Sequence, residues 1–315
     1  MIDMHYDLLS VIYRDMLNKN LKKTKEWIKN YNKDNITGLI ANLYFMSKKE
    51  MEKELHPYYY NENISVLEMF RRSTEKLKEI LPEDIKVLFA IEGCDYIKDE
   101  KELEELRKIG LSSICIVWNE KNKYGSGTRF IGGLTEEGKS FIHKAISLGI
   151  GIDLSHTNEE TFYDIIDLVR NEMKNNLEPI VYASHSNSRT LCEEIRNLKD
   201  EQLEAIKSVN GYVGVMSNKR FISNNFENIT NEELRKIYLK HIDYIGNMIG
   251  FDHVVLSTDD MSFAKEVNEV YGLRAIYDYK NIKQKIKSDL LGKYESQIVE
   301  DILEKNAERI FQKIQ

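Results

Sequence analysis

The chain has 315 residues, of which 42% are hydrophobic and 31% charged, and its 45 Lys and Arg against 52 Asp and Glu give a formal net charge of −7. This composition is typical of a folded globular protein and excludes a disordered or fibrous chain. The negative balance and the lack of a basic block argue against nucleic acid as a partner.

The length suits either two domains or one large α/β barrel. No linker rich in proline or glycine divides the chain, which has only 3 prolines, so we expect residues 1–315 to form a single domain. The 3 cysteines form no CxxC pair, which argues against a disulfide framework and a cysteine-based zinc site. Because no leader-like or membrane-spanning apolar stretch is visible, we expect a cytoplasmic protein without a membrane partner.

Short β-rich apolar runs alternate with helical segments along the chain. The runs are Ile2–Asp7, Ile36–Phe45, Ile85–Glu92, Ser112–Asn119, Gly149–His156, Pro179–His185, Gly211–Ser217 and His253–Asp259. Eight such runs predict a parallel sheet, and their number favours a closed (β/α)8 TIM-like barrel over an open doubly wound sheet. The first run is not followed by the GxGxxG fingerprint of dinucleotide-binding sheets.

Several helices are indicated by their first residues. Thr157-Asn-Glu-Glu160 and Thr230-Asn-Glu-Glu233 have the form of capping boxes, and each precedes a segment with helical periodicity. Gly250 offers a stop for the second of these helices. We expect a closing helix over Gln297–Gln312.

Acids and histidines stand at the C-terminal ends of the apolar runs. They are His5, Asp7, Glu92, His156, His185 and Asp259. In a barrel these ends gather on one face, which is where barrel enzymes carry their active sites. The regularity predicts a metal-centred hydrolase with its metal site at the C-terminal ends of the strands.

His5 and Asp7 are one residue apart, so on a strand both side chains point to the same side and can reach one metal ion. An isolated HxD pair is more often an ordinary hydrogen-bonded pair. Glu92 ends an apolar strand, where its carboxylate could cap a neighbouring helix or bridge two metal ions about 3.5–4 Å apart. These residues by themselves leave both alternatives open.

His156 and His185 close two consecutive apolar runs, and neutral imidazoles are good zinc ligands. Asp153 and the neighbouring serines could orient the two rings through hydrogen bonds. The other four histidines lie within expected helices, in a loop or at a strand start, and we expect structural or surface roles for them: His56, His143, His241 and His253.

Asp259 ends the last apolar run and could act as a proton shuttle between the attacking water and the leaving nitrogen. Asp260 is its rival, but adjacent residues of a strand face opposite sides, so only one of the two should point into the site. We prefer Asp259.

The sequence resembles the membrane (renal-type) dipeptidase family, peptidase family M19, which belongs to the amidohydrolase superfamily of metal-dependent (β/α)8 barrels. The matching segments cover nearly the whole chain and are Asp3-Met-His5-Tyr-Asp7, Ile91-Glu92-Gly93, Gly133-Leu-Thr-Glu-Glu-Gly138, Asp153-Leu-Ser-His156-Thr157, Ser184-His185-Ser186-Asn187 and Arg196-Asn197-Leu198.

The resemblance implies two divalent metal ions, with zinc favoured. According to this resemblance, His5 and Asp7 hold one ion, His156 and His185 hold the other, and Glu92 bridges the two ions. It further implies that Arg196 binds the substrate's carboxylate, a task that suits its planar guanidinium. The alternative for Arg196 is a surface arginine before a helix over residues 200–208.

Two departures from the family pattern concern the substrate side of the site. Where the family has a histidine before an asparagine, this chain has Trp118-Asn119, and we expect both residues to contact the substrate. An indole offers one donor and a large apolar face, and loss of an oxyanion-type donor can lower turnover by ~10²–10³. The family's Asp-Phe-Asp-Gly is here Asp259-Asp260-Met261-Ser262.

Three hypotheses follow. The first is a dipeptidase that cleaves a dipeptide or related small amide with a hydroxide bridging two metal ions. The second keeps the metals but acts on a lactone, a cyclic amide or a phosphoester. The third is a catalytically impaired member with a binding role, which the full set of five proposed ligands argues against. A homodimer is compatible with the sequence, and such ligands also accept manganese, iron or cobalt.

Overall fold

The computed structural model describes residues 1–45, 64–260 and 275–314 and contains an eight-stranded parallel sheet in the order β1 to β8. The strands are β1 (Ile2–Tyr6), β2 (Gly38–Tyr44), β3 (Lys86–Glu92), β4 (Leu111–Cys115), β5 (Gly151–Asp153), β6 (Val181–Ala183), β7 (Tyr212–Met216) and β8 (Val254–Ser257). Each strand pairs in parallel with the next, and helices follow between them, so the predicted (β/α)8 barrel is confirmed.

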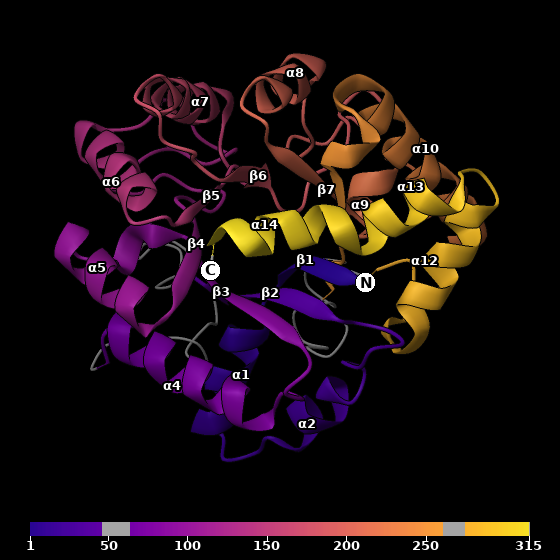
Figure 1. The fold of residues 1–315 in the computed structure, drawn as a ribbon, viewed down its shortest axis with the longest axis horizontal. Coiled ribbons are helices and arrows are strands. Elements are labelled where there is room, and N and C mark those ends of the chain that lie inside the picture. Colours follow the sequence, from indigo (N-terminus) through magenta and orange to yellow (C-terminus); the bar gives the residue numbers. More distant parts are fainter. Residues whose placement is uncertain (46–63, 261–274, 315) are drawn as a thin grey trace.

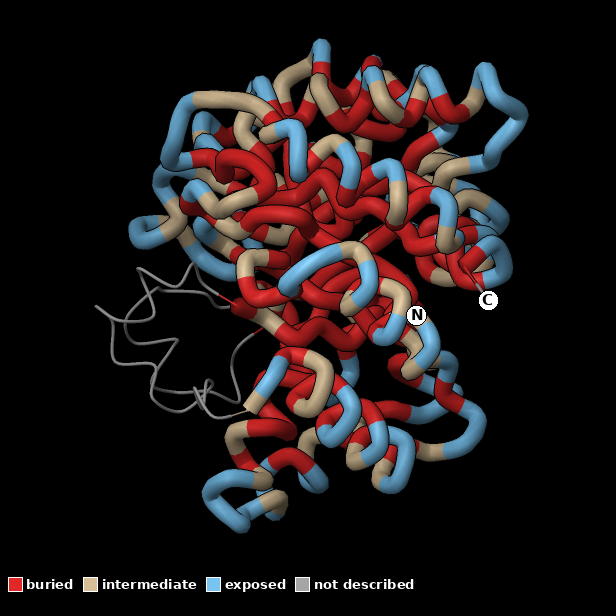
Figure 2. Tube along the Cα trace, turned by 90° about the vertical axis from the view of Figure 1, so that its left-hand side faces the viewer, coloured by how far each residue is buried: buried red, intermediate tan, exposed pale blue. Residues whose placement is uncertain are grey.

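The helices surround the strands (Figure 1). They are α1 (Leu8–Leu17), α2 (Lys22–Ile28), α4 (Val66–Ile80), α5 (Glu100–Ile109), α6 (Glu136–Ser147), α7 (Glu159–Lys174), α8 (Asp200–Ser208), α9 (Lys219–Ile222), α10 (Asn231–Ile249), α12 (Ile282–Leu291), α13 (Ser296–Glu300) and α14 (Asn306–Ile314). Buried chain runs through the centre of the molecule, and exposed chain lies on the outer helices and loops (Figure 2). Within the described ranges, no helix combines the length and apolar character of a membrane span.

The barrel interior is apolar at the end where the strands begin. Ile2, Met4 and Leu88 from the strands form one buried cluster with Phe311 and Ile314 of α14. In Figure 1, α14 lies across the middle of the molecule, over these strands. Burial of this cluster closes the N-terminal end of the barrel and leaves the opposite end for polar side chains.

The join between β1 and β8 depends on a side chain. Asp3 of β1 accepts hydrogen bonds from the backbone N–H of Thr258 at 2.9 Å and from its hydroxyl at 2.5 Å. Tyr279 lies 3.3 Å from the same carboxylate. Asp3 therefore ties the residue after β8 to the first strand, directly before Asp259.

The strand ends differ from the predicted ones. β5 ends at Asp153 and β6 at Ala183, so His156 and His185 lie in the loops that follow and are not the last strand residues. β4 likewise ends at Cys115, before Trp118. In each case the chain turns away from the ladder soon after reaching the C-terminal end of the barrel, where the loops build the site.

One of the two predicted capping boxes is wrong. Thr230 and Glu233 form the capping box of α10, and Gly250 ends that helix, both as predicted. In the other segment α7 begins one residue later than predicted, and the Thr157 hydroxyl donates to the carbonyl of Leu154. Asn158 takes the capping position of α7.

The predicted closing helix is also not continuous. α13 is followed by a π-helical turn at Asp301–Lys305 before α14 begins. Asn306, directly after that turn, donates to the carbonyls of Phe251 and Val254. The wider turn changes the phase of the helix at the point where it starts to cover the barrel end.

Candidate metal centre

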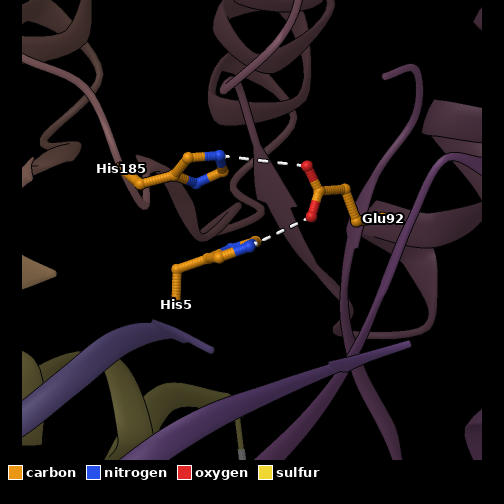
Figure 3. Close-up of side chains that lie close together, drawn as sticks. All are labelled: His5, Glu92 and His185. Carbon is orange, nitrogen blue, oxygen red and sulfur yellow. Dashed lines mark ion pairs between the residues drawn. The ribbon is translucent and has the colours of Figure 1, made fainter. Parts of the chain in front are cut away.

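Three imidazole rings converge on one buried carboxylate at the C-terminal end of the barrel. The Nε2 atom of His5 lies 3.0 Å from Oε2 of Glu92, while Nε2 of His156 lies 2.6 Å and that of His185 3.8 Å from Oε1. Figure 3 shows His5 and His185 pointing toward the two oxygens of Glu92. The carboxylate therefore offers one oxygen to His5 and the other to the remaining two histidines.

Two further carboxylates lie beside His5. Oδ1 of Asp7 is 3.6 Å from Nε2 of His5, and one donor atom each of His5, Asp7 and Asp259 lie within 4.8 Å of one another. Oδ1 of Asp7 is buried and has no hydrogen-bond partner among the described residues. A buried carboxylate oxygen without a partner is costly unless a cation binds it, so this group fits a metal ion.

The second group consists of His156 and His185, whose Nε2 atoms are 2.9 Å apart. Zinc binds imidazole nitrogen at about 2.0–2.1 Å, which sets two nitrogens of a tetrahedral site roughly 3.3 Å apart. If the two rings moved slightly apart, both could therefore bind the same ion. Imidazole and carboxylate donors in these two groups fit a divalent metal such as zinc.

The protonation states of Glu92, His156 and His185 suit metal ligation, whereas the carboxylates beside His5 favour its protonated form, in which the proton occupies the place of a cation. Burial disfavours charge on Glu92, but His156 and His5 outweigh it and hold the pKa of Glu92 well below its usual range. Burial lowers the pKa of His156 to about 3 and lowers that of His185 well below its usual range. Burial opposes charge on His5 too, yet Glu92 and Asp7 raise the pKa of His5. An ionised carboxylate and neutral imidazoles are the forms that bind metals.

Each ring has a polar neighbour at its outer nitrogen. Nδ1 of His156 is 2.9 Å from Oδ1 of Asn119, and Nδ1 of His185 is 2.7 Å from Oγ of Ser184. Nδ1 of His5 lies 3.3 Å from the same Ser184 oxygen and 3.2 Å from Nδ2 of Asn42. Outer hydrogen bonds of this kind fix the tautomer and direction of metal-binding imidazoles.

Two site residues have left-handed backbone conformations. The φ angle is 67° at His156 and 45° at Asp259. Such angles are unfavourable for residues other than glycine and persist where the surrounding structure enforces them. Both angles place a functional side chain at the mouth of the barrel.

Asp259 and Asp260 have different neighbours, but both follow the end of β8 at Ser257, so the alternation of strand residues expected from the sequence does not apply to them. Asp259 belongs to the group around His5, and burial raises the pKa of Asp259 to about 8, although His5 opposes the rise. A cation bound at that group would lower this pKa again. Asp260 is buried and acts electrostatically on Tyr6 and Tyr31. Met261 and Ser262 lie outside the described residues.

Arg196 is buried close to the cluster. It is 8% exposed, and burial lowers the pKa of its guanidinium against the opposing charges of Glu92 and Asp259. Within the described part of the chain no carboxylate lies within salt-bridge distance of it. Its position before α8 agrees with the predicted loop, but its burial does not fit the surface alternative.

Trp118 stands beside the second group of donors. Its ring centroid is 5.8 Å from that of His156 and 5.3 Å from that of Tyr44, and the Arg129 guanidinium lies 5.6 Å from it. Asn119 uses its side-chain oxygen for His156 and for the Thr128 hydroxyl, so it orients a histidine. Contact of Trp118 and Asn119 with substrate stays a prediction.

The other histidines that the structure describes lie away from the cluster. His143 pairs with Glu172 and is 61% exposed, His253 bonds the carbonyl of Gly211, and His241 is buried between two backbone groups. His56 lies outside the described residues. Sequence reasoning missed Asp3 and Asn42, although a polar residue inside a buried apolar strand was an available signal for both.

Histidines and carboxylates gathered at the C-terminal ends of a (β/α)8 barrel are the arrangement of a metal-dependent hydrolase. The comparison with known sequences gives the family: its model matches residues 2–315, and the chain belongs to the membrane dipeptidase family, peptidase family M19. Both expectations drawn from the sequence, the family and a hydrolytic enzyme, are confirmed.

Two relatives illustrate the sequence similarity. A Klebsiella pneumoniae protein described as uncharacterised, in the pqqA 5′ region, is 35% identical over 58% of this chain and 68% of its own length. The dipeptidase tcpJ of Claviceps purpurea is 23% identical over 79% of this chain and 56% of its own length. The match thus spans between about half and two thirds of each relative.

Solved structures share the fold over the whole chain. A metallopeptidase dipeptidase of family M19 has a TM-score of 0.75 at 18% identity, covering 99% of this chain and 97% of that one. A Rhodobacter sphaeroides metallopeptidase, solved with a phosphinate mimic of the dipeptide L-Ala-D-Ala, has a TM-score of 0.74 at 19% identity, covering 100% and 99%.

Proposed function

We propose that this chain is a dipeptidase that hydrolyses the amide bond of a dipeptide with the help of two divalent metal ions. The observation that carries the proposal is the division of Glu92: one oxygen faces His5 and the other faces His156 and His185. A buried arginine, Arg196, lies beside this cluster and has no salt-bridge partner among the described residues. Together they offer a place for a reacting amide and for a free carboxylate.

His5 and Asp7 would hold one ion, His156 and His185 the other, and Glu92 would contact both. When bound, such a pair of ions supplies water activated for attack near neutral pH and polarises the scissile carbonyl. The orphaned Oδ1 of Asp7 and the close Nε2 atoms of His156 and His185 support this assignment. That the attacking hydroxide bridges both ions stays a prediction.

Arg196 would bind the C-terminal carboxylate of the dipeptide. Its planar fork can donate to both carboxylate oxygens, and burial strengthens such a pair because water does not compete. Asp259 would accept a proton from the attacking water and deliver one to the leaving nitrogen. Its place beside the donor atoms of His5 and Asp7 supports this role.

A second candidate is hydrolysis of a non-peptide substrate such as a lactone, a cyclic amide or a phosphoester. The observation in its favour is Trp118, which puts an apolar ring beside His156 where the family has an imidazole. This candidate keeps the metal centre but gives Arg196 no carboxylate to bind.

Substitution of Arg196 separates the two candidates. We expect Arg196→Ala to raise KM for a dipeptide by about 10- to 100-fold, because a charged hydrogen-bonded pair contributes about 1.5–3 kcal/mol. The matched control is the same dipeptide with its C-terminal carboxylate amidated, for which the substitution should change KM little. Equal kinetics of both proteins on the free dipeptide would reject the role of Arg196 in binding its carboxylate, and a wild-type protein that hydrolyses no dipeptide would reject the dipeptidase proposal.

Several predictions from the sequence remain proposals. They are zinc as the native metal, a cytoplasmic location, a single domain over residues 1–315, a possible homodimer, and the absence of nucleic-acid and membrane partners. Metal analysis of the protein purified from its own cells would test the first of these.

A further inference from the structure

The hydroxyl of Ser184 lies between both groups of metal donors. It contacts His185 of one group at 2.7 Å and His5 of the other at 3.3 Å, in each case at Nδ1. We propose that Ser184 is a positioning residue shared by the two ion sites, so that the affinity for both ions depends on this one hydroxyl. This inference rests on the metal-binding part of the proposed function.

The direction of the Ser184 hydroxyl is fixed by Asp153. Oγ of Ser184 lies 2.5 Å from Oδ2 of Asp153, and an ionised carboxylate can only accept. The hydroxyl hydrogen therefore points to Asp153. Oδ1 of the same carboxylate accepts from the backbone N–H of Ser155 and of Ser184, both at 2.9 Å, which holds Asp153 in place.

A hydroxyl oxygen that has given its hydrogen to Asp153 can act only as an acceptor toward the two rings. It has two lone pairs, which suffice for the Nδ1–H groups of His5 and His185. In a neutral ring, a hydrogen on Nδ1 leaves Nε2 without hydrogen, which is the form in which each histidine binds a metal ion after losing any second proton. Ser184 and Asp153 are both buried, so water does not replace these bonds.

Asn42 is the rival partner of His5. Its Nδ2 atom lies 3.2 Å from Nδ1 of His5 and also donates to the carbonyl of Ile40 at 3.3 Å. An amide nitrogen cannot accept the Nδ1 hydrogen that the metal-binding tautomer of His5 carries. In this orientation of Asn42, Ser184 is the acceptor for His5.

His156 serves as an internal reference, since its outer partner is Asn119 and not Ser184. Loss of the Ser184 hydroxyl should therefore leave one ligand of the second ion correctly oriented, while both ions lose the orientation of one histidine. We expect partial weakening at both sites and complete loss at neither.

The test measures zinc binding to the full chain by competition with a chromophoric chelator, fitted to two dissociation constants. We expect Ser184→Ala to weaken both by about 10- to 100-fold, the usual effect of removing an outer partner of a metal ligand. Ser186→Ala is the matched control: Ser186 follows His185 in the chain, and its hydroxyl is buried and has no partner among the described residues. This control should bind zinc like the wild type.

Asp153→Asn gives a second, independent test. An amide NH2 facing Ser184 would donate to Oγ and turn the hydroxyl hydrogen toward His185, which favours the tautomer that cannot bind metal. We expect it to weaken zinc binding at least as much as Ser184→Ala does. In the double variant Asp153→Asn should add little, because the hydroxyl it redirects is gone. If Ser184→Ala does not fold, the single variant Asp153→Asn still tests the proposal.

The outcomes separate this inference from the function on which it rests. Wild-type protein that binds no zinc would overturn the proposed metal centre itself. If the wild type binds two zinc ions tightly and Ser184→Ala has the same two dissociation constants, only the role of Ser184 is overturned. If Ser184→Ala weakened the binding of only one ion, Ser184 would not serve both sites. Asn42→Ala would then be expected to weaken the binding of the other ion.

Discussion

The two ends of the barrel are built on the same strands but contain opposite chemistry. At the N-terminal end, Ile2 and Met4 of β1 pack against Phe311 of α14 in an apolar cluster. At the C-terminal end the same strand leads to His5 and Asp7, buried beside other ionisable groups. The change takes place within the six residues Ile2–Asp7.

The contrast shows which end stabilises the fold and which end binds ligands. Apolar burial at the N-terminal end is favourable without any partner from outside the chain. Buried carboxylates and left-handed backbone at the C-terminal end are unfavourable until a ligand compensates them. Substitutions at the two ends should therefore affect different measurements.

Glu92→Gln should have the largest effect on function. An amide cannot supply two anionic oxygens, so we expect the zinc stoichiometry to fall below two and dipeptide hydrolysis to fall by at least about 10³-fold, more than the loss of one oxyanion donor. The metal-free protein should stay folded, as circular dichroism would show. Unfolding of the metal-free variant would contradict the assignment of this end to function.

Phe311→Ala makes the opposite test. Removal of a buried aromatic side chain from the α14 cluster should lower the free energy of unfolding by about 3–5 kcal/mol, measured by denaturant titration. Zinc stoichiometry should not change. Phe130→Ala is the control, because Phe130 is 46% exposed and its loss should cost less than about 0.5 kcal/mol.

His241 gives a pH-dependent effect at the C-terminal end. It accepts from the N–H of Ser188 and donates to the carbonyl of Ile222, and burial lowers its pKa from 6.5 to about 4. The folded form thus needs neutral His241, so the stabilisation is complete above pH 6.5 and is lost as the pH falls toward 4.

The difference between these two pKa values corresponds to about 3 kcal/mol. In His241→Gln, which does not titrate, the free energy of unfolding should decline less between pH 6.5 and 4 than in the wild type. Parallel pH profiles of the two proteins would rule out this contribution of His241.

Thr258→Val should have the smallest effect, at the seam between β8 and β1. It removes the hydroxyl that donates to Asp3, at an expected cost of about 1–2 kcal/mol of unfolding free energy. Because Asp259 follows directly, kcat should fall while KM changes little. Thr258→Ser keeps the hydroxyl and should restore kcat; failure of this rescue would show that Asp3 does not position Asp259.

Much of the fold could be predicted from the sequence, because apolar runs that alternate with helices leave few topologies. The same topology brings the strand ends together, which is why His5, Glu92, His156 and His185 could be placed in one cluster from their positions alone. Arg196 was predicted with a surface alternative, and only its burial in the structure decides against that alternative.

Other features depend on contacts between distant segments and could not be predicted. The φ angles of His156 and Asp259 result from the turns that follow β5 and β8. Asn158, which caps α7 in place of Thr157, also donates to the carbonyls of Phe130 and Gly132 in an earlier loop. The contact of Ser184 with His5 joins residues 179 positions apart.

The most direct test is a crystal structure of the zinc-loaded protein with anomalous scattering recorded at the zinc edge. We expect two peaks, one bound by His5 and Asp7 and the other by His156 and His185, with one oxygen of Glu92 on each. A single peak, or peaks that Glu92 does not join, would contradict the two-ion centre.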